Sequence, residues 1–438
     1  MRLPTRREEA AIVERLEVPF EGDGAGVGPL SWGQIENWNA IRSLGHWMPL
    51  GGAVELEPGT TLDDVLDELR WHMCRHVTLR TRLRLPSDGS APAQEVFGAG
   101  ALTVSVYDDV DVVHVVALLR DRPLDFAAEW PIRAAVVRTG GVPTHLVAVL
   151  SHFATDGAGA QIMLREVRER PSTPVEGLAP LAQARWQESP AGRRQNAAAQ
   201  RHFESVLRAM PPVRFPVPLE PSRPRYWRGV LDSVALDRAL RLLTARLDAD
   251  PAATLLAVFA AAVASTSGIA PVVVRPVVSN RFRAGLGGVV CTATQAGLCL
   301  IDTAGPFPEV VDRSRRASLA AFKYAYFDQR DLWALMDRLG LEPGQIGCFL
   351  NDRRMPSPAD PPPSLSDLPP STFTWITRQD HPGLEPLILD VETLDSGLRL
   401  TVHTDTRWVA PADSERLLWA MEEIALRECP SSAAPVRP

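Results

Sequence analysis

Lysine is almost absent from this chain. Lys323 is the one lysine among 46 basic residues, so nearly every positive charge is an arginine. The 53 acidic residues outnumber the basic ones and give a net charge of −7. Proteins that bind nucleic acid usually show a basic excess or a basic stripe. The sequence shows neither, which argues against a nucleic-acid-binding protein.

Cysteines and long apolar runs are also scarce. The five cysteines are an odd number and include no C-x-x-C pair, so neither a disulfide framework nor a zinc ribbon is expected. The N-terminal stretch is charged throughout and lacks the apolar segment of a signal peptide. The longest apolar run, 252–264, is shorter than the roughly 20 residues of a membrane span. These absences predict a cytoplasmic protein in a reducing compartment, with no membrane.

What is present is an alternation of helix and strand patterns along 438 residues. Helices are predicted at 32–45, 62–76, 110–123, 158–170, 252–266 and 412–428, and strands at 79–85, 102–107, 132–139, 144–152, 271–279 and, in a β-rich stretch, 286–302. Residues 355–370 are expected to form a proline-rich loop and 429–438 a disordered tail. We therefore predict an α/β protein with an N-terminal lobe at 1–175, an interlobe linker at 171–183 and a C-terminal lobe at 184–438.

One segment carries a chemical pattern, the sequence LSHFATDG at 150–157. His152 ends an apolar strand, and histidine is the side chain best suited to proton transfer near neutral pH. Asp156 follows four residues later and can hold the loop that orients the imidazole. Gly157 is expected to permit a backbone turn that a side chain would resist. The residues alone also leave open a purely structural histidine at a strand end.

In its context the segment resembles the HHxxxDG motif of the condensation domains of nonribosomal peptide synthetases and of related acyltransferases with the chloramphenicol-acetyltransferase fold. His152, Asp156 and Gly157 match the motif, and Ser151 stands where the family has its first histidine. Three further blocks resemble condensation-domain blocks in the same order, PLSWGQIENW at 29–38, RHVTLRTRL at 75–83 and RPVVSNR at 275–281. The likeness extends over about residues 28–428.

The resemblance implies two lobes that form a V, with a substrate tunnel between them. It implies that His152 is the catalytic residue, which accepts the proton of the nucleophile or hydrogen-bonds the transition state. Ser151, Asp156, Gly157 and Arg281 would support the site, with Asp156 paired to Arg281 and therefore a poor base. The chain contains no recognisable adenylation or carrier segment, so we expect a freestanding condensation enzyme.

The implied reaction joins a carrier-bound acyl or peptidyl thioester to an amine or a hydroxyl group in specialised metabolism. The donor would be presented on the phosphopantetheine of a carrier protein, no cofactor would be tightly bound, and the enzyme is expected to be a monomer. Two alternatives stay open. A non-catalytic member of the fold could recruit carrier proteins or tailoring enzymes, and Ser151 favours this alternative slightly. An acyltransferase could instead use coenzyme A thioesters, which present the same pantetheine arm.

Other residues support weaker interpretations. Ser279 and Asn280 could hydrogen-bond a substrate, although strand-end capping is the simpler role. Trp375 could line the tunnel or belong to the core. His72 and His76 share a helix face at a spacing that can suit a metal, but no H-E-x-x-H pattern surrounds them, so a structural pair and no metal site are predicted.

Overall fold

The computed structural model describes residues 12–213, 215–216, 220–342, 346, 348–354, 364–380 and 385–429. Most of the expected proline-rich loop (355–363) and nearly all of the expected disordered tail (430–438) lie outside these residues. The fold is mixed α/β, and it divides into two compact units, Met1–Arg194 with Ser279–Thr294, and Gln195–Val278 with Gln295–Pro438. The stretch 171–183, expected to be a linker, lies inside the first unit.

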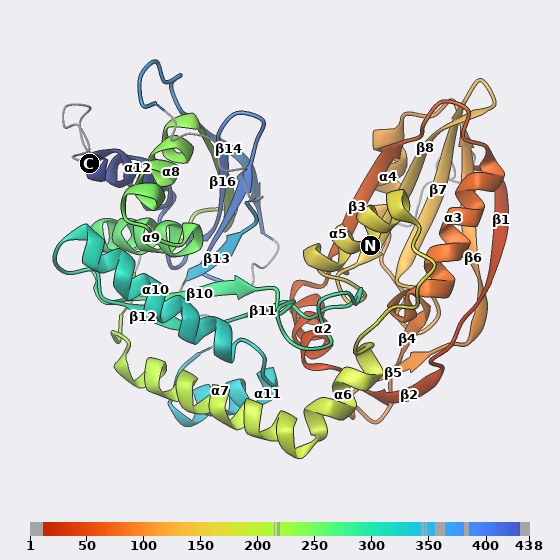
Figure 1. Cartoon of the computed structure of the whole chain (residues 1–438), viewed down its shortest axis with the longest axis horizontal. Helices are drawn as coiled ribbons and strands as arrows, with labels where there is room; N and C mark the ends of the chain where they lie inside the picture. The colour runs from red at the N-terminus through yellow and green to blue at the C-terminus, as the bar shows by residue number, and fades with distance from the viewer. Residues whose placement is uncertain are drawn as a thin grey trace. The chain divides into compact units, whose positions relative to one another are not determined.

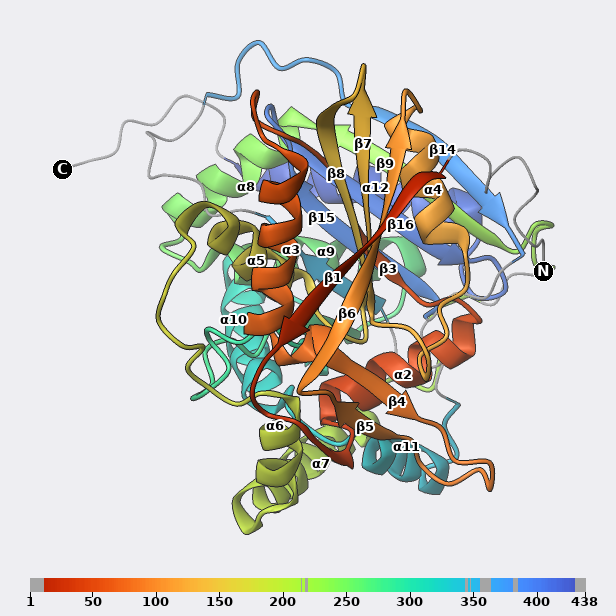
Figure 2. The ribbon, with the colours of Figure 1, turned by 90° about the vertical axis from the view of Figure 1, so that its right-hand side faces the viewer.

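The first unit is built on a five-stranded sheet (Figures 1 and 2). Its strand order is β1 (Ile12–Glu21), β6 (Ala99–Asp108), β7 (Ile132–Thr139), β8 (Val142–Ser151) and β3 (Pro49–Glu55). β6 and β7 are parallel, and the other pairs are antiparallel. A small second sheet has the order β2 (Gly26–Pro29), β5 (Ala93–Val96) and β4 (Thr81–Arg84).

Helices cover this sheet so closely that the first six residues of β7 are all buried. The apolar side chains of α3 (Leu62–Arg75) pack with alternate residues of β6 and β7, and Met163 of α5 (Gly157–Glu169) joins the same cluster. α4 (Val112–Asp121) contacts β3, β7 and β8 through a face that includes the buried Val115. Both faces of β7 are therefore covered, and Arg133, the one charged residue among these six, is buried with its apolar neighbours.

Local sequence signals fix the helix ends near the motif. α2 (Trp32–Leu44) begins after Ser31, which forms a capping box with Gln34, and α3 begins after Thr61 in the same way. The strand predicted at 79–85 is wrong at its start, because residues 77–80 form a 3-10 turn, η1 (Val77–Arg80), before β4. The turn buries the Arg80 side chain, which donates to the carbonyl groups of Met73, Gly22, Asp23 and Phe97.

The second unit contains an eight-stranded mixed sheet. Its order is β11 (Gln295–Ala296), β10 (Val272–Val278), β13 (Cys348–Asp352), β15 (Leu387–Thr393), β16 (Leu398–Asp405), β9 (Tyr226–Ser233) and β14 (Thr372–Gln379), with β12 (Cys299–Ile301) also paired to β10. The expected β-rich stretch 286–302 is mostly loop, and this prediction is corrected. Its first part is held by polar contacts within the first unit, so that only the two short strands β11 and β12 form.

The core of the second unit lies between the sheet and four helices, α8 (Val234–Arg246), α9 (Pro251–Ser267), α10 (Phe307–Tyr324) and α12 (Pro411–Glu428). α9 is buried on nearly every side, which explains its almost uniformly apolar sequence. A separate cluster joins α7 (Pro190–Ala209) to α11 (Gln329–Arg338). No single helix in the described ranges is long and apolar enough to cross a membrane, and α8 with α9, bent by 118°, meets that test only as a pair.

Candidate active site

The motif lies where β8 ends and the chain turns into α5. Ser151 is the last residue of β8 and is fully buried. Its hydroxyl donates to the Trp47 carbonyl oxygen at 3.1 Å and accepts from the Phe153 N–H at 3.2 Å. No hydrogen bond joins Ser151 Oγ to the imidazole of His152 among the described residues, so the serine hydroxyl serves the turn.

His152 follows β8 directly and is half-buried. Burial lowers the pKa of the imidazole, and its own carbonyl group and Asp156 oppose this shift only in part. The ring is therefore neutral at neutral pH. Asn37 Nδ2 on α2 lies 3.2 Å from Nδ1. Nε2 has no hydrogen-bond partner in the part of the chain that the structure describes, which leaves it available to a substrate.

Asp156 precedes α5 and is 1% exposed. Its Oδ1 accepts from Gly159 N–H at 2.8 Å and from Arg281 Nη2 at 2.6 Å. Its Oδ2 accepts from the Ala293 and Thr294 N–H groups at 2.9 Å and from Thr294 Oγ1 at 2.8 Å. Burial would raise the pKa of Asp156, but Arg281 and the other donors lower it. The expected ion pair with Arg281 is present, and the carboxylate is a structural anion.

Arg281 lies in a loop, 279–294, that belongs to the same unit as the motif. Besides Asp156, its guanidinium donates to the carbonyl oxygens of Leu286 and Cys291, at 3.2 and 2.9 Å. Cys291 is buried, and burial raises the pKa of its thiol, so it is no nucleophile at neutral pH. The guanidinium therefore organises the loop from within.

The two residues before Arg281 differ in their roles. Asn280 is fully buried in a left-handed conformation at φ 59°. Its Nδ2 donates to the Ala293 carbonyl oxygen, and its Oδ1 accepts from Arg283 Nε. The suggested substrate contact of Asn280 is therefore replaced by a structural role. Ser279 is exposed, and its substrate contact stays a prediction.

The role expected of Gly157 is wrong in one respect. Gly157 is the first residue of α5 and has no positive φ, and a Cβ there would meet open space. The glycine that close packing requires is Gly159. A Cβ at that position would lie 2.3 Å from Thr155 Oγ1 and 3.3 Å from Arg281 Nη2. Gly157 leaves space beside the helix start and does not relieve backbone strain.

Trp375 lies in the second unit, on β14. Its ring makes edge contacts with Trp227 and Phe373, with ring centroids 5.2 and 5.1 Å apart. These ring contacts favour the interpretation of Trp375 as a residue that packs against its neighbours. Its contact with a substrate remains a prediction.

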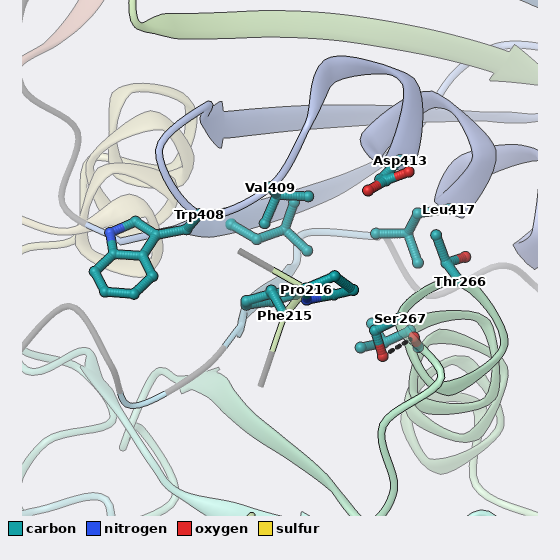
Figure 3. A pocket seen from close by; sticks show the side chains of 10 residues that line it. Phe215, Pro216, Thr266, Ser267, Trp408, Val409, Asp413 and Leu417 are labelled. Atoms are coloured by element: carbon teal, nitrogen blue, oxygen red, sulfur yellow. Dashed lines mark hydrogen bonds between the residues drawn. The ribbon is translucent and has the colours of Figure 1, made fainter. Parts of the chain in front are cut away.

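A small cavity in the second unit contains none of the predicted site residues (Figure 3). It has a volume of ≈ 20 Å³ and is lined by mostly apolar side chains, among them Val263, Trp408 and Leu417. A space of this size holds about one water molecule, so it suits no acyl chain.

His72 and His76 form part of an ion-paired network between α3 and α5. The two imidazoles and the Glu166 carboxylate offer atoms within 4.8 Å of one another, a spacing that could hold a metal ion. Arg75, however, contacts the same carboxylate at 3.0 Å, while His76 Nε2 lies 2.7 Å from its other oxygen. A guanidinium at that carboxylate opposes the binding of a cation. The network explains the histidines as structural residues.

Three residues that the sequence did not single out belong to the site. Thr292 Oγ1 donates to the His152 carbonyl oxygen at 2.8 Å, and Thr294 contributes two donors to Asp156. Asn37 contacts His152 from α2. Asn37 stands inside the 29–38 block, and both threonines stand in the sequence CTAT. No local pattern links either segment to residue 152, because the contacts are long-range.

No family model matches the chain. It is 26% identical over 302 residues to the phosphinothricin tripeptide synthetase PhsC of Streptomyces viridochromogenes, a match that covers 62% of this chain and 27% of that protein. It is 27% identical over 252 residues to the AMB antimetabolite synthetase AmbB of Pseudomonas aeruginosa, covering 53% of this chain and 20% of that protein. The match thus spans only a small part of either synthetase.

Solved structures decide the fold. The structure of the condensation domain that mediates chain release from the enacyloxin polyketide synthase matches with a TM-score of 0.74 and 20% identity, over 95% of this chain and 85% of that one. The condensation domain of the Monacolin K polyketide synthase MokA matches with a TM-score of 0.72 and 16% identity, over 92% and 97%. This chain has the condensation-domain fold.

A third solved structure with this condensation-domain fold is the X-domain from teicoplanin biosynthesis in complex with OxyB. It matches with a TM-score of 0.67 and 17% identity, over 94% of this chain and 97% of that one. The predicted resemblance is therefore confirmed at the level of the condensation-domain fold.

The buried Asp156 carboxylate generates a prediction about stability. Asp156→Ala should lower the free energy of unfolding by about 3–5 kcal/mol, because Arg281 would be left buried without its partner. Chemical denaturation followed by circular dichroism measures this loss. Asp312→Ala is the matched control, because Asp312 pairs with two arginines on an exposed helix face and its loss should change the stability little. Equal small losses in both variants would contradict the account.

The Glu166 network generates a prediction about pH. Burial raises the pKa of Glu166, but contacts with His76 and Arg75 outweigh it and lower the pKa from 4.5 to about 2. Its stabilisation is thus complete above about pH 4.5 and is lost as the pH falls towards 2.

In that range the free energy of unfolding of the wild-type protein should fall with decreasing pH more steeply than that of Glu166→Gln. The two slopes should differ by up to ~1.4 kcal/mol per pH unit. Unfolding curves recorded at a series of pH values test this expectation. Glu169→Gln is the control on the same helix, since its carboxylate is exposed. If the free energy of unfolding of Glu166→Gln depends on pH as steeply as that of the wild-type protein, the lowered pKa of Glu166 is refuted.

Proposed function

We propose that this protein is an acyltransferase that joins an acyl or peptidyl thioester to an amine or a hydroxyl group. The nucleophile attacks the thioester carbonyl carbon, the carbon–sulfur bond breaks, and a proton from the nucleophile ends on the departing thiol. The products are an amide or an ester and a free pantetheine thiol. His152 is the catalytic residue in this proposal.

The observation that carries the proposal is the unpartnered Nε2 of a neutral imidazole beside a fixed anion. The His152 carbonyl oxygen is held by Thr292 Oγ1 at 2.8 Å and by Asn37 Nδ2 at 3.0 Å. The Asp156 carboxylate is satisfied by its own donors, so it does not compete for the ring. Such a rigid group can hydrogen-bond a reacting atom or accept its proton, and positioning supplies much of the acceleration in acyl transfer.

The donor in this proposal is a thioester on the phosphopantetheine of a carrier protein. The similarity to two peptide and antimetabolite synthetases supports this class of donor. We also place the reaction in the cytoplasm, which fits the five free thiols of the chain. A coenzyme A thioester presents the same arm, and a direct comparison of the two donors separates them.

Recruitment without catalysis is the second candidate. The observation that favours it is Ser151, which replaces the first histidine of the motif. Ser151 still has a defined structural part, because its hydroxyl bridges Trp47 and Phe153. Mutation of His152 separates the two candidates, since recruitment does not need an imidazole.

His152→Ala should lower turnover by about two to four orders of magnitude, the scale of a positioned acid–base group. The measurement is thiol release from a carrier-bound thioester in the presence of an amine. His145→Ala is the matched control, since His145 lies on the same strand and its ring is hydrogen-bonded to the neighbouring Thr144 hydroxyl. Near-normal turnover in a folded His152→Ala protein would favour recruitment.

Ser151→Ala should keep substantial activity, because the Ser151 hydroxyl supports the turn and faces no base. The loss of its two hydrogen bonds should cost about 1–3 kcal/mol of stability. Intact-mass spectrometry of the protein after incubation with thioester alone tests the chemical point. An acyl adduct on Ser151 would overturn the assignment and indicate a covalent, two-step transfer.

A further inference from the structure

The His152 imidazole has a neighbour whose chemistry bears on its protonation. Asn37, half-buried on α2, places its Nδ2 atom 3.0 Å from the His152 carbonyl oxygen and 3.2 Å from Nδ1. A carbonyl oxygen can only accept hydrogen bonds. The atom facing it must therefore be the amide nitrogen, and this fixes the orientation of the Asn37 side chain.

The same carbonyl oxygen is already saturated. The Thr292 hydroxyl has one proton and faces two carbonyl oxygens, that of His152 at 2.8 Å and that of Phe153 at 3.2 Å, so its shorter hydrogen bond goes to His152. Together with the Asn37 amide, this bond occupies both lone pairs of the His152 carbonyl oxygen. A proton on Nδ1 would face the amide N–H of Asn37 and would be a third donor at the His152 carbonyl. An unprotonated Nδ1 can instead accept a hydrogen bond from the Asn37 amide group. The proton of the neutral ring is then on Nε2.

We infer that Asn37 is a positioning residue that selects the Nε2–H tautomer of His152. This inference rests on the proposed acyl transfer. Nε2 then presents a hydrogen-bond donor to the substrate and no lone pair, so His152 stabilises the negative charge that develops on the thioester carbonyl oxygen. The proton that the nucleophile loses ends on the thiol sulfur without residing on His152.

Nitrogen-15 NMR of histidine-labelled protein tests the tautomer directly, because protonated and unprotonated ring nitrogens resonate far apart. The chain has 9 histidines, so the signals of His152 are assigned by their absence from His152→Gln protein. We expect an unprotonated Nδ1 and a protonated Nε2 near neutral pH. A protonated Nδ1 with a bare Nε2 would overturn the inference.

Asn37→Asp supplies the opposite polarity at nearly unchanged volume. The carboxylate would accept from Nδ1, so the proton should move to Nδ1 and the pKa of His152 should rise. The other charged group that acts on the ring is Asp156, which raises the pKa of His152 and is itself ion-paired to Arg281. Turnover should fall at least about tenfold, as expected for a misplaced tautomer. Asn39→Asp adds the same charge on the same helix and should leave the His152 signals unchanged.

The NMR and kinetic results separate this inference from the proposed function. If the ring proton is on Nε2 in the wild-type protein and on Nδ1 in Asn37→Asp, the role of Asn37 is supported, even if no acyl transfer is detected. Active transfer with wild-type His152 signals in Asn37→Asp refutes the role of Asn37 and leaves the proposed function standing.

Discussion

The Asp156 carboxylate is the interaction on which the rest of the site depends. It gathers donors from the start of α5, from the backbone at 293–294, from Thr294 and from Arg281. A buried anion without these donors would cost several kcal/mol, so the loop and the helix start are tied to one another. His152 stands four residues earlier in the same turn. The geometry of the imidazole is thus a consequence of an ion-paired anchor that does no proton transfer.

The residues of the motif therefore have different roles. Ser151 closes the end of β8, Asp156 fixes the helix start, and Gly159 allows the close approach of the Thr155 hydroxyl and, less tightly, of Arg281. His152 keeps its Nε2 atom free of hydrogen bonds to the described residues. A site built in this way presents one neutral group to a substrate from a rigid background, which suits a reaction between two bound partners.

Much of the fold could be predicted because its signals are local. The capping residues Ser31 and Thr61 and the mostly apolar sequence of β7 each act within a few residues. The prediction failed where distant contacts prevail over local propensity. Arg80 is drawn inward by four carbonyl groups, and the 286–302 stretch is shaped by the loop around Arg281. Asn37 and Thr292 were missed for the same reason, since each meets residue 152 from a remote segment.

The central claim is acyl transfer from a carrier-bound thioester, and one measurement addresses it most directly. A purified acylated carrier protein is mixed with this protein, with and without an amine or alcohol nucleophile, and its intact mass is followed. The account predicts that the acyl mass leaves the carrier only when protein and nucleophile are both present, and that no acyl mass appears on this chain. A carrier that stays fully acylated with every nucleophile offered would contradict it.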